Sequence, residues 1–147
     1  MGEMKELEVK AWLNRAFYAD KKVKALEMLV EKRREQATSA SVCYECNDKG
    51  KSNGSKNSTE EALMMIAESE LELLRNIREL MRVANEVSYA IAQLHDDDLE
   101  TVLIHRYLLF HTIEHTAELM NYSVRTIKNK QSKAIEKLCT FLPCFAP

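Results

Sequence analysis

Glycine and proline are scarce in this chain of 147 residues, and their positions leave long stretches open to helix formation. The glycines are Gly2, Gly50 and Gly54, and the prolines are Pro143 and Pro147. Since these residue types interrupt helices most strongly, every strong interruption falls near an end or in one central stretch. We therefore expect an all-α protein with one modest core plus an extension.

Long apolar runs and the features of a secretion signal are also missing. No apolar stretch approaches the length that crosses a bilayer, and 30% of the residues are charged. Residues 1–6 lack the basic and apolar regions of a signal peptide. These features predict a soluble protein that stays in the cytosol and has no membrane partner.

The net charge of −2 is not that of a basic protein, but the positive charges are concentrated in one segment. Residues 121–138 hold five basic residues and one acidic residue, a net charge of +4 that leaves −6 for the rest of the chain. The basic residues are Arg125, Lys128, Lys130, Lys133 and Lys137. The low overall charge therefore does not exclude a nucleic-acid partner for this segment.

Two stretches repeat apolar residues at steps of three or four, which places them on one side of a helix. The first stripe contains Val9, Trp12, Ala16, Ala19, Val23, Leu26 and Val30. The second contains Leu63, Ile66, Leu73, Ile77, Leu80, Ala84, Val87, Ile91 and Leu94, and Glu70 interrupts it. Residues 1–95 should form two long helices that pack as an antiparallel hairpin, or against copies of themselves in an oligomer. The polar, aperiodic stretch 37–57 is predicted to be a flexible linker between them.

The segment 96–147 is expected to form a helix-turn-helix domain. Apolar and aromatic residues mark its first helix, from Leu99 through Val102, Leu103 and Tyr107 to Phe110. Asp98 is placed to cap this helix, and Thr112 is placed to cap a shorter one. Asn121 should end the short helix in a left-handed conformation, after which Ser123 caps the last helix.

The last helix has one apolar side and one polar side. The apolar side contains Val124, Ile127, Ala134, Ile135 and Leu138. A recognition helix needs donors for base edges near its N-terminus and cations beside them for phosphates, and the polar side offers both. We predict that this domain binds double-stranded DNA. The predicted DNA-binding residues are Thr112, Ser123, Arg125, Thr126, Lys128, Asn129, Lys130 and Lys133.

Different roles are expected within this set of residues. Arg125 and Asn129 lie one turn apart near the start of the helix, where base edges come within reach. Arginine pairs with guanine and asparagine with adenine, so both should specify sequence. Lys130 and Lys133 lie farther along or beside that face and are predicted to contact phosphates.

Four segments of the domain together resemble region four of bacterial sigma factors. They read LETVLIHRY at 99–107, TIEHTAELMNYS at 112–123, TI at 126–127 and AIEKL at 134–138. The layout of two long helices, a polar linker and this domain is similar to small regulators of Gram-positive phages and prophages, the ArpU-like and RinA-like group. The resemblance implies control of phage genes, late genes in particular, by DNA binding near promoters in a bacterial host. Asn121 stands where most relatives have glycine.

Alternative functions remain open at this point. In a regulator the hairpin would serve self-association or contact with RNA polymerase. A small terminase subunit, which marks phage DNA for packaging, also joins a helix-turn-helix to oligomerising helices. A ring of about eight or more copies would indicate packaging, whereas a monomer or two-fold dimer would indicate regulation. A purely structural coiled coil would require that the basic helix bind no nucleic acid.

The histidine-rich segment contains a pattern found in zinc enzymes. His111, Glu114 and His115 match the H-x-x-E-H pattern of inverted zinc peptidases. If Thr112 caps the helix, His111 lies outside it, and the two histidines do not share a helical face. A third ligand is not evident downstream. We therefore interpret these as surface histidines.

Four cysteines form two pairs that would supply thiolates for zinc. Cys43 and Cys46 lie in the predicted linker, and Cys139 and Cys144 lie near the C-terminus. Each long helix should extend about 50 Å, which separates the two pairs, and cytosolic thiols are normally reduced. No nucleophile beside a base and no phosphate-binding glycine loop is visible. We expect reduced cysteines, no metal, no cofactor and no enzymatic activity.

Overall fold

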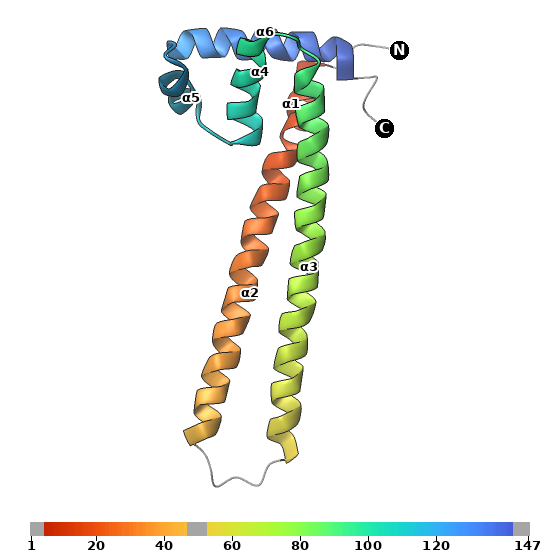
Figure 1. Cartoon of the computed structure of the whole chain (residues 1–147), viewed down its shortest axis with the longest axis vertical. Helices are drawn as coiled ribbons and strands as arrows, with labels where there is room; N and C mark the ends of the chain where they lie inside the picture. The colour runs from red at the N-terminus through yellow and green to blue at the C-terminus, as the bar shows by residue number, and fades with distance from the viewer. Residues whose placement is uncertain (1–4, 47–52, 143–147) are drawn as a thin grey trace. The chain divides into compact units, whose positions relative to one another are not determined.

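The structure, a computed structural model, describes residues 5–46 and 53–142, and of 40–46 and 53–58 it describes only the backbone. Every element in the described ranges is a helix, so the predicted all-α class is confirmed. The elements are α1 (Glu6–Leu13), α2 (Arg15–Cys46), α3 (Asn53–Ala92), α4 (Asp97–Leu103), η1 (Ile104–Leu108), α5 (Ile113–Met120) and α6 (Val124–Phe141) (Figure 1). Among the described residues, none of these helices has the length and apolar character needed to span a membrane.

The chain divides into two compact units. The first contains residues 1–19 and 80–147, and the second contains residues 20–79. The predicted boundary lay after residue 95, so the first unit is larger than the predicted C-terminal domain. It also takes in α1 and the end of α3, because apolar side chains from both enter its core.

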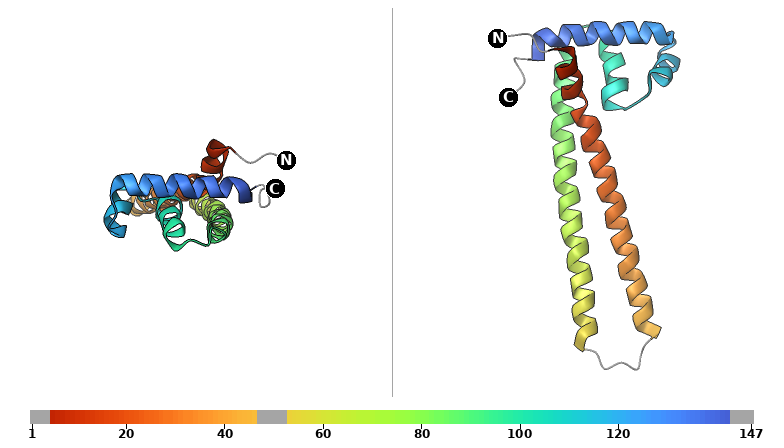
Figure 2. Two further views of the ribbon diagram at one scale, coloured as in Figure 1. Left: turned by 90° about the horizontal axis from the view of Figure 1, so that it is seen from above. Right: turned by 180° about the vertical axis from the view of Figure 1, so that it is seen from behind.

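The core of the first unit brings together α1, the end of α3, α4, η1 and α6. Its buried side chains include Val9, Leu13, Val87, Ile91, Leu99, Leu103, Tyr107, Ile135 and Leu138. Within this unit α6 packs against α1, α4 and α5, and Figure 2 shows it crossing them in two further views. The apolar side predicted for the last helix is thus the side that faces the core.

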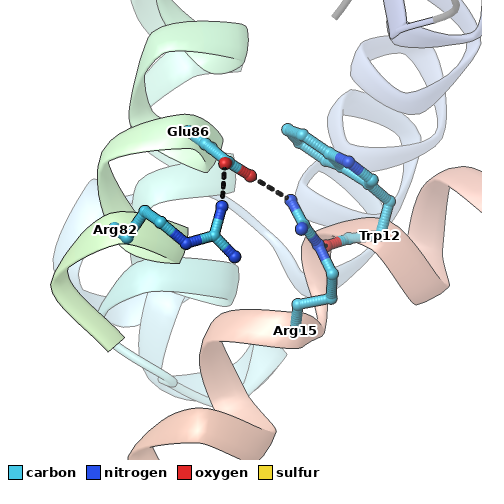
Figure 3. A network of polar contacts seen from close by, with 4 residues as sticks. All are labelled: Trp12, Arg15, Arg82 and Glu86. Carbon is cyan, nitrogen blue, oxygen red and sulfur yellow. Dashed lines mark hydrogen bonds and ion pairs between the residues drawn. The ribbon is translucent and has the colours of Figure 1, made fainter. Parts of the chain in front are cut away.

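A break at Asn14 separates α1 from α2, where the apolar spacing predicts one continuous helix. The Arg15 side chain lies at this break (Figure 3). Its Nε donates to the carbonyl oxygen of Trp12 at 3.0 Å, and its Nη2 pairs with Glu86 at 2.9 Å. Arg82 bonds to the same carboxylate. Arg15 therefore satisfies a carbonyl near the end of α1 and also joins α2 to α3 within the first unit.

In the second unit, α2 and α3 run alongside each other in opposite directions (Figure 1). The stripe residues that are buried or half-buried here are Val23, Leu26, Val30, Ile66, Leu73 and Ile77. Polar contacts follow where Glu70 interrupts the second stripe. Arg34 pairs with Glu70, and Arg33 bonds to the buried hydroxyl of Ser69. The interruption in the apolar pattern is thus matched by charged residues on the partner helix.

The predicted linker over 37–57 is longer than the break between the helices. Helix α2 continues to Cys46, and α3 begins at Asn53, so only residues 47–52 separate them, and these lie outside the described residues. Polar composition does not by itself end a helix, because serine and threonine are only moderately unfavourable in one. A glycine such as Gly54 is tolerated in a first turn, where few helical hydrogen bonds depend on it.

The N-cap of helix α4 lies two residues earlier than predicted. Asp96 has an extended backbone, and its Oδ1 accepts a hydrogen bond from the Leu99 N–H at 3.2 Å. Asp96 is therefore the N-cap, and the prediction that Asp98 caps this helix is wrong. Three consecutive aspartates offered the same capping chemistry, and the sequence did not distinguish among them.

The helix predicted from Leu99 to Phe110 changes character at Ile104. Over η1 the turn is widened, and the Leu109 N–H donates to the Ile104 carbonyl at 2.9 Å. Phe110 then adopts a φ of 60°, which ends the helix. Single widened turns of this kind are frequent at functional sites.

Candidate nucleic-acid interface

Helix α5 begins and ends where the sequence predicts. The Thr112 side chain accepts a hydrogen bond from the His115 N–H at 3.1 Å, so Thr112 is the N-cap. Asn121 follows the helix with φ 57° and ψ 40°, the predicted left-handed conformation. Asparagine tolerates this region better than other side chains with a Cβ atom. The chain therefore turns sharply between α5 and α6.

The start of α6 is fixed by two hydroxyl groups. The Ser123 Oγ accepts a hydrogen bond from the Thr126 N–H at 3.1 Å, which confirms the predicted cap. The same Oγ lies 2.8 Å from the Thr126 hydroxyl. These contacts satisfy a backbone donor that would otherwise lack a partner, and they set the direction in which α6 leaves the turn.

The inner sides of α4, α5 and α6 meet in a small apolar cluster. Val102, Ala117 and Ile127 are buried there, one from each helix. The partly buried residues around them are Ile113, Met120 and Val124. Because Ala117 has a small side chain, α5 and α6 can cross closely at this point. This cluster fixes which side of α6 remains exposed.

The outer side of α6 carries four of the eight predicted DNA-binding residues. The predicted residues that are exposed there are Arg125, Lys128, Asn129 and Lys133. Thr126 is half-buried, and its hydroxyl and backbone N–H face Ser123. Exposed donors therefore lie in the first two turns of α6, and Lys133 follows one turn later.

Lys130 departs from this set because it bonds within the protein. Its Nζ lies 3.1 Å from the Asp98 carboxylate and 5.1 Å from the centre of the Tyr122 ring. The Tyr122 hydroxyl donates to the same carboxylate at 2.9 Å. Asp98 thus joins the start of α4 to the turn and to α6. The predicted phosphate contact of Lys130 stays a prediction, but this lysine is half-buried and already paired with Asp98.

Ionisation of these three groups is coupled. Hydrogen bonds from Lys130 and Tyr122 lower the pKa of the Asp98 carboxyl. The hydrogen bond to Asp98 raises the pKa of Lys130, and the same carboxylate raises the pKa of Tyr122. The ion pair is therefore fully charged at neutral pH, and a phosphate would have to compete with Asp98 for Lys130.

A second polar network, absent from the sequence-based prediction, centres on Arg106. Its Nε donates to the Gln131 side chain at 3.0 Å, and its Nη1 donates to the His111 carbonyl at 2.6 Å. The Gln131 amide in turn lies 3.4 Å from the Tyr107 hydroxyl. Arg106 therefore ties the segment before α5 to the middle of α6. An arginine at the end of a helix, close to unsatisfied carbonyls, was the available signal.

Three histidines gather beside this network. His111 precedes α5, so it does not share a helical face with His115, as predicted, although the two rings are in contact with centroids 4.6 Å apart. The His105 ring stacks on His111, and their Nδ1 atoms are 3.1 Å apart. Partial burial lowers the pKa of His111, and the neighbouring His115 and His105 lower it further.

The described residues contain no group of three or more histidine, cysteine, aspartate or glutamate side chains placed to hold a metal ion. Cys139 is buried in the core of the first unit. The side chains of Cys43, Cys46 and Cys144 lie outside the described part of the structure. The expectation about the cysteine pairs therefore stays a prediction.

No protein-family model, no curated protein and no solved structure matches the chain. The resemblance to region four of sigma factors rests on the sequence segments alone. Function must therefore be argued from the geometry of α5, α6 and the turn between them.

Proposed function

We propose that this chain is a sequence-specific DNA-binding protein in which α5 and α6 form a helix-turn-helix and α6 enters the major groove. The observation that carries the proposal is the outer side of α6. Arg125 and Asn129 are exposed one turn apart near the start of a helix whose opposite side is buried and whose first turn is fixed by caps. Helix-turn-helix proteins read base edges with this part of the recognition helix.

The proposed contacts divide into two kinds. Arg125 and Asn129 carry the side chains that pair bidentately with guanine and adenine, so they are assigned to base edges. Lys128 and Lys133 are exposed beside them and are assigned to phosphates. The remaining predicted residues, Thr112, Ser123, Thr126 and Lys130, are assigned to holding the helices in place, because their polar groups bond within the protein.

The biological role that fits this assignment is regulation of phage or prophage transcription, late genes in particular, in the cytoplasm of a bacterial host. It is supported by the resemblance of the C-terminal segments to sigma region four. Binding near a promoter places the protein where it contacts RNA polymerase. The proposed role requires neither a cofactor nor catalytic residues.

Selection of bound sequences from a pool of random duplexes tests the proposal. The full chain should enrich a defined motif, and the control variant Lys32→Ala, which removes an exposed lysine of α2, should enrich the same motif. The Arg125→Ala/Asn129→Ala variant should enrich none. Failure of the wild-type chain to enrich any motif would remove the proposal.

Measurement of the mass of the protein on its selected duplex separates regulation from DNA packaging. One or two chains on a site are expected for a regulator, and two chains should give a palindromic motif. A closed ring of about eight or more chains would favour the packaging role of a small terminase subunit instead.

A further inference from the structure

One side of α3 in the second unit is apolar and exposed. Met64 is 63% exposed, Leu71 is 54% exposed and Leu74 is 53% exposed, although each is an apolar side chain on a regular helix. These side chains lie beside the stripe that faces α2, not on it. A single exposed leucine needs no explanation, but a row of them marks a surface that associates.

The spacing of this row is that of a coiled-coil seam. Successive residues on it are Met64, Ala67, Leu71, Leu74 and Arg78, at steps of three and four. Such steps keep a row straight along a supercoiled pair of helices. We call this row the outer stripe of α3. Packing against α2 leaves it open, so it is available for a further helix.

The charges beside the outer stripe can form ion pairs with the same charges of a second copy. Glu68 and Arg75 are both exposed on the same flank, seven residues apart, which is about 10 Å along the helix. In an antiparallel pair centred between Leu71 and Leu74, Glu68 of each copy comes opposite Arg75 of the other. A two-fold axis therefore makes two ion pairs from one sequence.

The same antiparallel arrangement accommodates Arg78, the one charged residue within the stripe. In the antiparallel pair Arg78 comes opposite the small Ala67 of the other copy, where its long side chain has room to reach solvent. In a parallel pair each residue would lie beside its own copy, and two Arg78 guanidinium groups would repel each other. Acidic residues outnumber basic ones in α3 between residues 60 and 79, which disfavours a nucleic acid or an anionic lipid surface as the occupant.

We infer that the outer stripe of α3 is a homodimer interface, in which two copies of this chain pack antiparallel around Leu71 and Leu74 with Glu68 opposite Arg75. The inference goes beyond the proposed DNA binding and does not depend on it. Dimerisation through residues 60–79 would also supply the second DNA-binding domain that a palindromic site requires.

Sedimentation equilibrium of the full chain, followed over protein concentration, tests the interface. The wild-type chain should form a dimer, and Leu71→Glu should weaken it by at least about a hundredfold, since each substitution is present twice and places a charge in the seam. Met65→Glu changes an equally exposed apolar residue off the stripe and should leave the dimer intact. Circular dichroism should show equal helix content for both variants.

Charge reversal tests the antiparallel register separately. Glu68→Arg and Arg75→Glu should each weaken self-association by about tenfold, because each creates two like-charge contacts. When the two variants are mixed, every flank contact becomes attractive, so a heterodimer should form in preference to either homodimer. A monomeric wild-type chain, an assembly larger than a dimer, a dimer that survives Leu71→Glu, or failure of the mixed variants to pair would each overturn the inference. None of these results depends on DNA.

Discussion

Asp98 connects three parts of the first unit through one carboxylate. It accepts hydrogen bonds from Lys130 of α6 and from Tyr122 of the turn, while it lies in the first turn of α4. Each contact is made at the surface, but together they relate the three segments whose geometry the proposed DNA contact requires. The two lysines predicted to contact phosphate therefore differ, because Lys130 is paired with Asp98 whereas Lys133 is exposed.

Alanine substitution of these lysines should separate their roles. Lys133→Ala should weaken binding to preferred and random duplexes alike and lower the salt slope of binding by about one, because one phosphate contact is lost. Lys130→Ala should lower Tm and leave the salt slope unchanged, because its partner is Asp98. Fluorescence anisotropy at several salt concentrations, together with thermal unfolding, measures both. A lowered slope for Lys130→Ala would restore it to the phosphate-binding face.

His111 should make stability depend on pH. Its pKa in the folded chain is lowered from the usual value of 6.5, mainly by burial. The unfolded chain therefore binds more protons than the folded chain below that pH, so stability is full above about pH 6.5 and falls as the pH drops through it. The urea midpoint should decrease between about pH 7.5 and pH 5.5. His111→Gln should flatten this decrease, and His95→Asn, outside the histidine group, should not.

Predictions for single residues succeeded where the contacts are made between residues close together along the chain. The caps at Thr112 and Ser123 and the left-handed Asn121 follow from contacts within four residues along the chain, and all three were predicted. The Asp98 partners Tyr122 and Lys130, and the Arg106 partner Gln131, lie more than twenty residues away, so only the packing of α4 and η1 against α6 brings them together. The predicted base contacts of Arg125 and Asn129 remain predictions.

The turn between α5 and α6 determines how the two helices are oriented. Asn121 occupies a left-handed conformation that costs about 1 kcal/mol for a residue with an ordinary side chain. Asn121→Ala should therefore destabilise the fold by about 1 kcal/mol, whereas Asn121→Gly should be at least as stable as the wild type. Equilibrium urea unfolding measures both. Equal stability of the alanine and glycine variants would contradict this account of the turn.

Element lengths followed the sequence less closely than element types. Apolar spacing predicts helices correctly around Val23 and Ile77, but the step of four residues continues across the break at Asn14. Conversely, the polar stretch from 37 to 46 has no apolar period and is still helical. Breaks and extensions of this kind depend on side chains such as Arg15, which satisfies a carbonyl at the break, and they are not visible in periodicity.

Across the whole molecule, fully buried apolar side chains are concentrated in the first unit. Leu138 of α6 is fully buried there, whereas Leu7 of α1 is 79% exposed. Leu138→Ala should cost about 2–5 kcal/mol of unfolding free energy through lost burial and a cavity. The matched change Leu7→Ala should cost less than about 0.5 kcal/mol. Denaturant unfolding compares them, and similar losses for the two would mean that the core is not where the structure places it.

The division of the molecule could be predicted only in part. The all-α class and the stripes were readable from the spacing of residues such as Val9 and Leu94. The membership of the units was not, because Leu13 and Val87 reach the core of α4 and α6 only after the chain has folded back. A stripe states which side of a helix is apolar but does not name the element that covers it.

The central claim is that the outer side of α6 reads DNA sequence, and the most direct test is the ratio of affinities for a selected duplex and a scrambled one. Anisotropy titrations would be carried out on the wild type, Arg125→Ala and the control Lys32→Ala. Arg125→Ala should lose about 1–3 kcal/mol on the selected duplex and little on the scrambled one, so that the ratio falls. The control should keep the wild-type ratio. An equal loss on both duplexes would make Arg125 a phosphate contact, and an unchanged ratio with unchanged affinities would contradict the account.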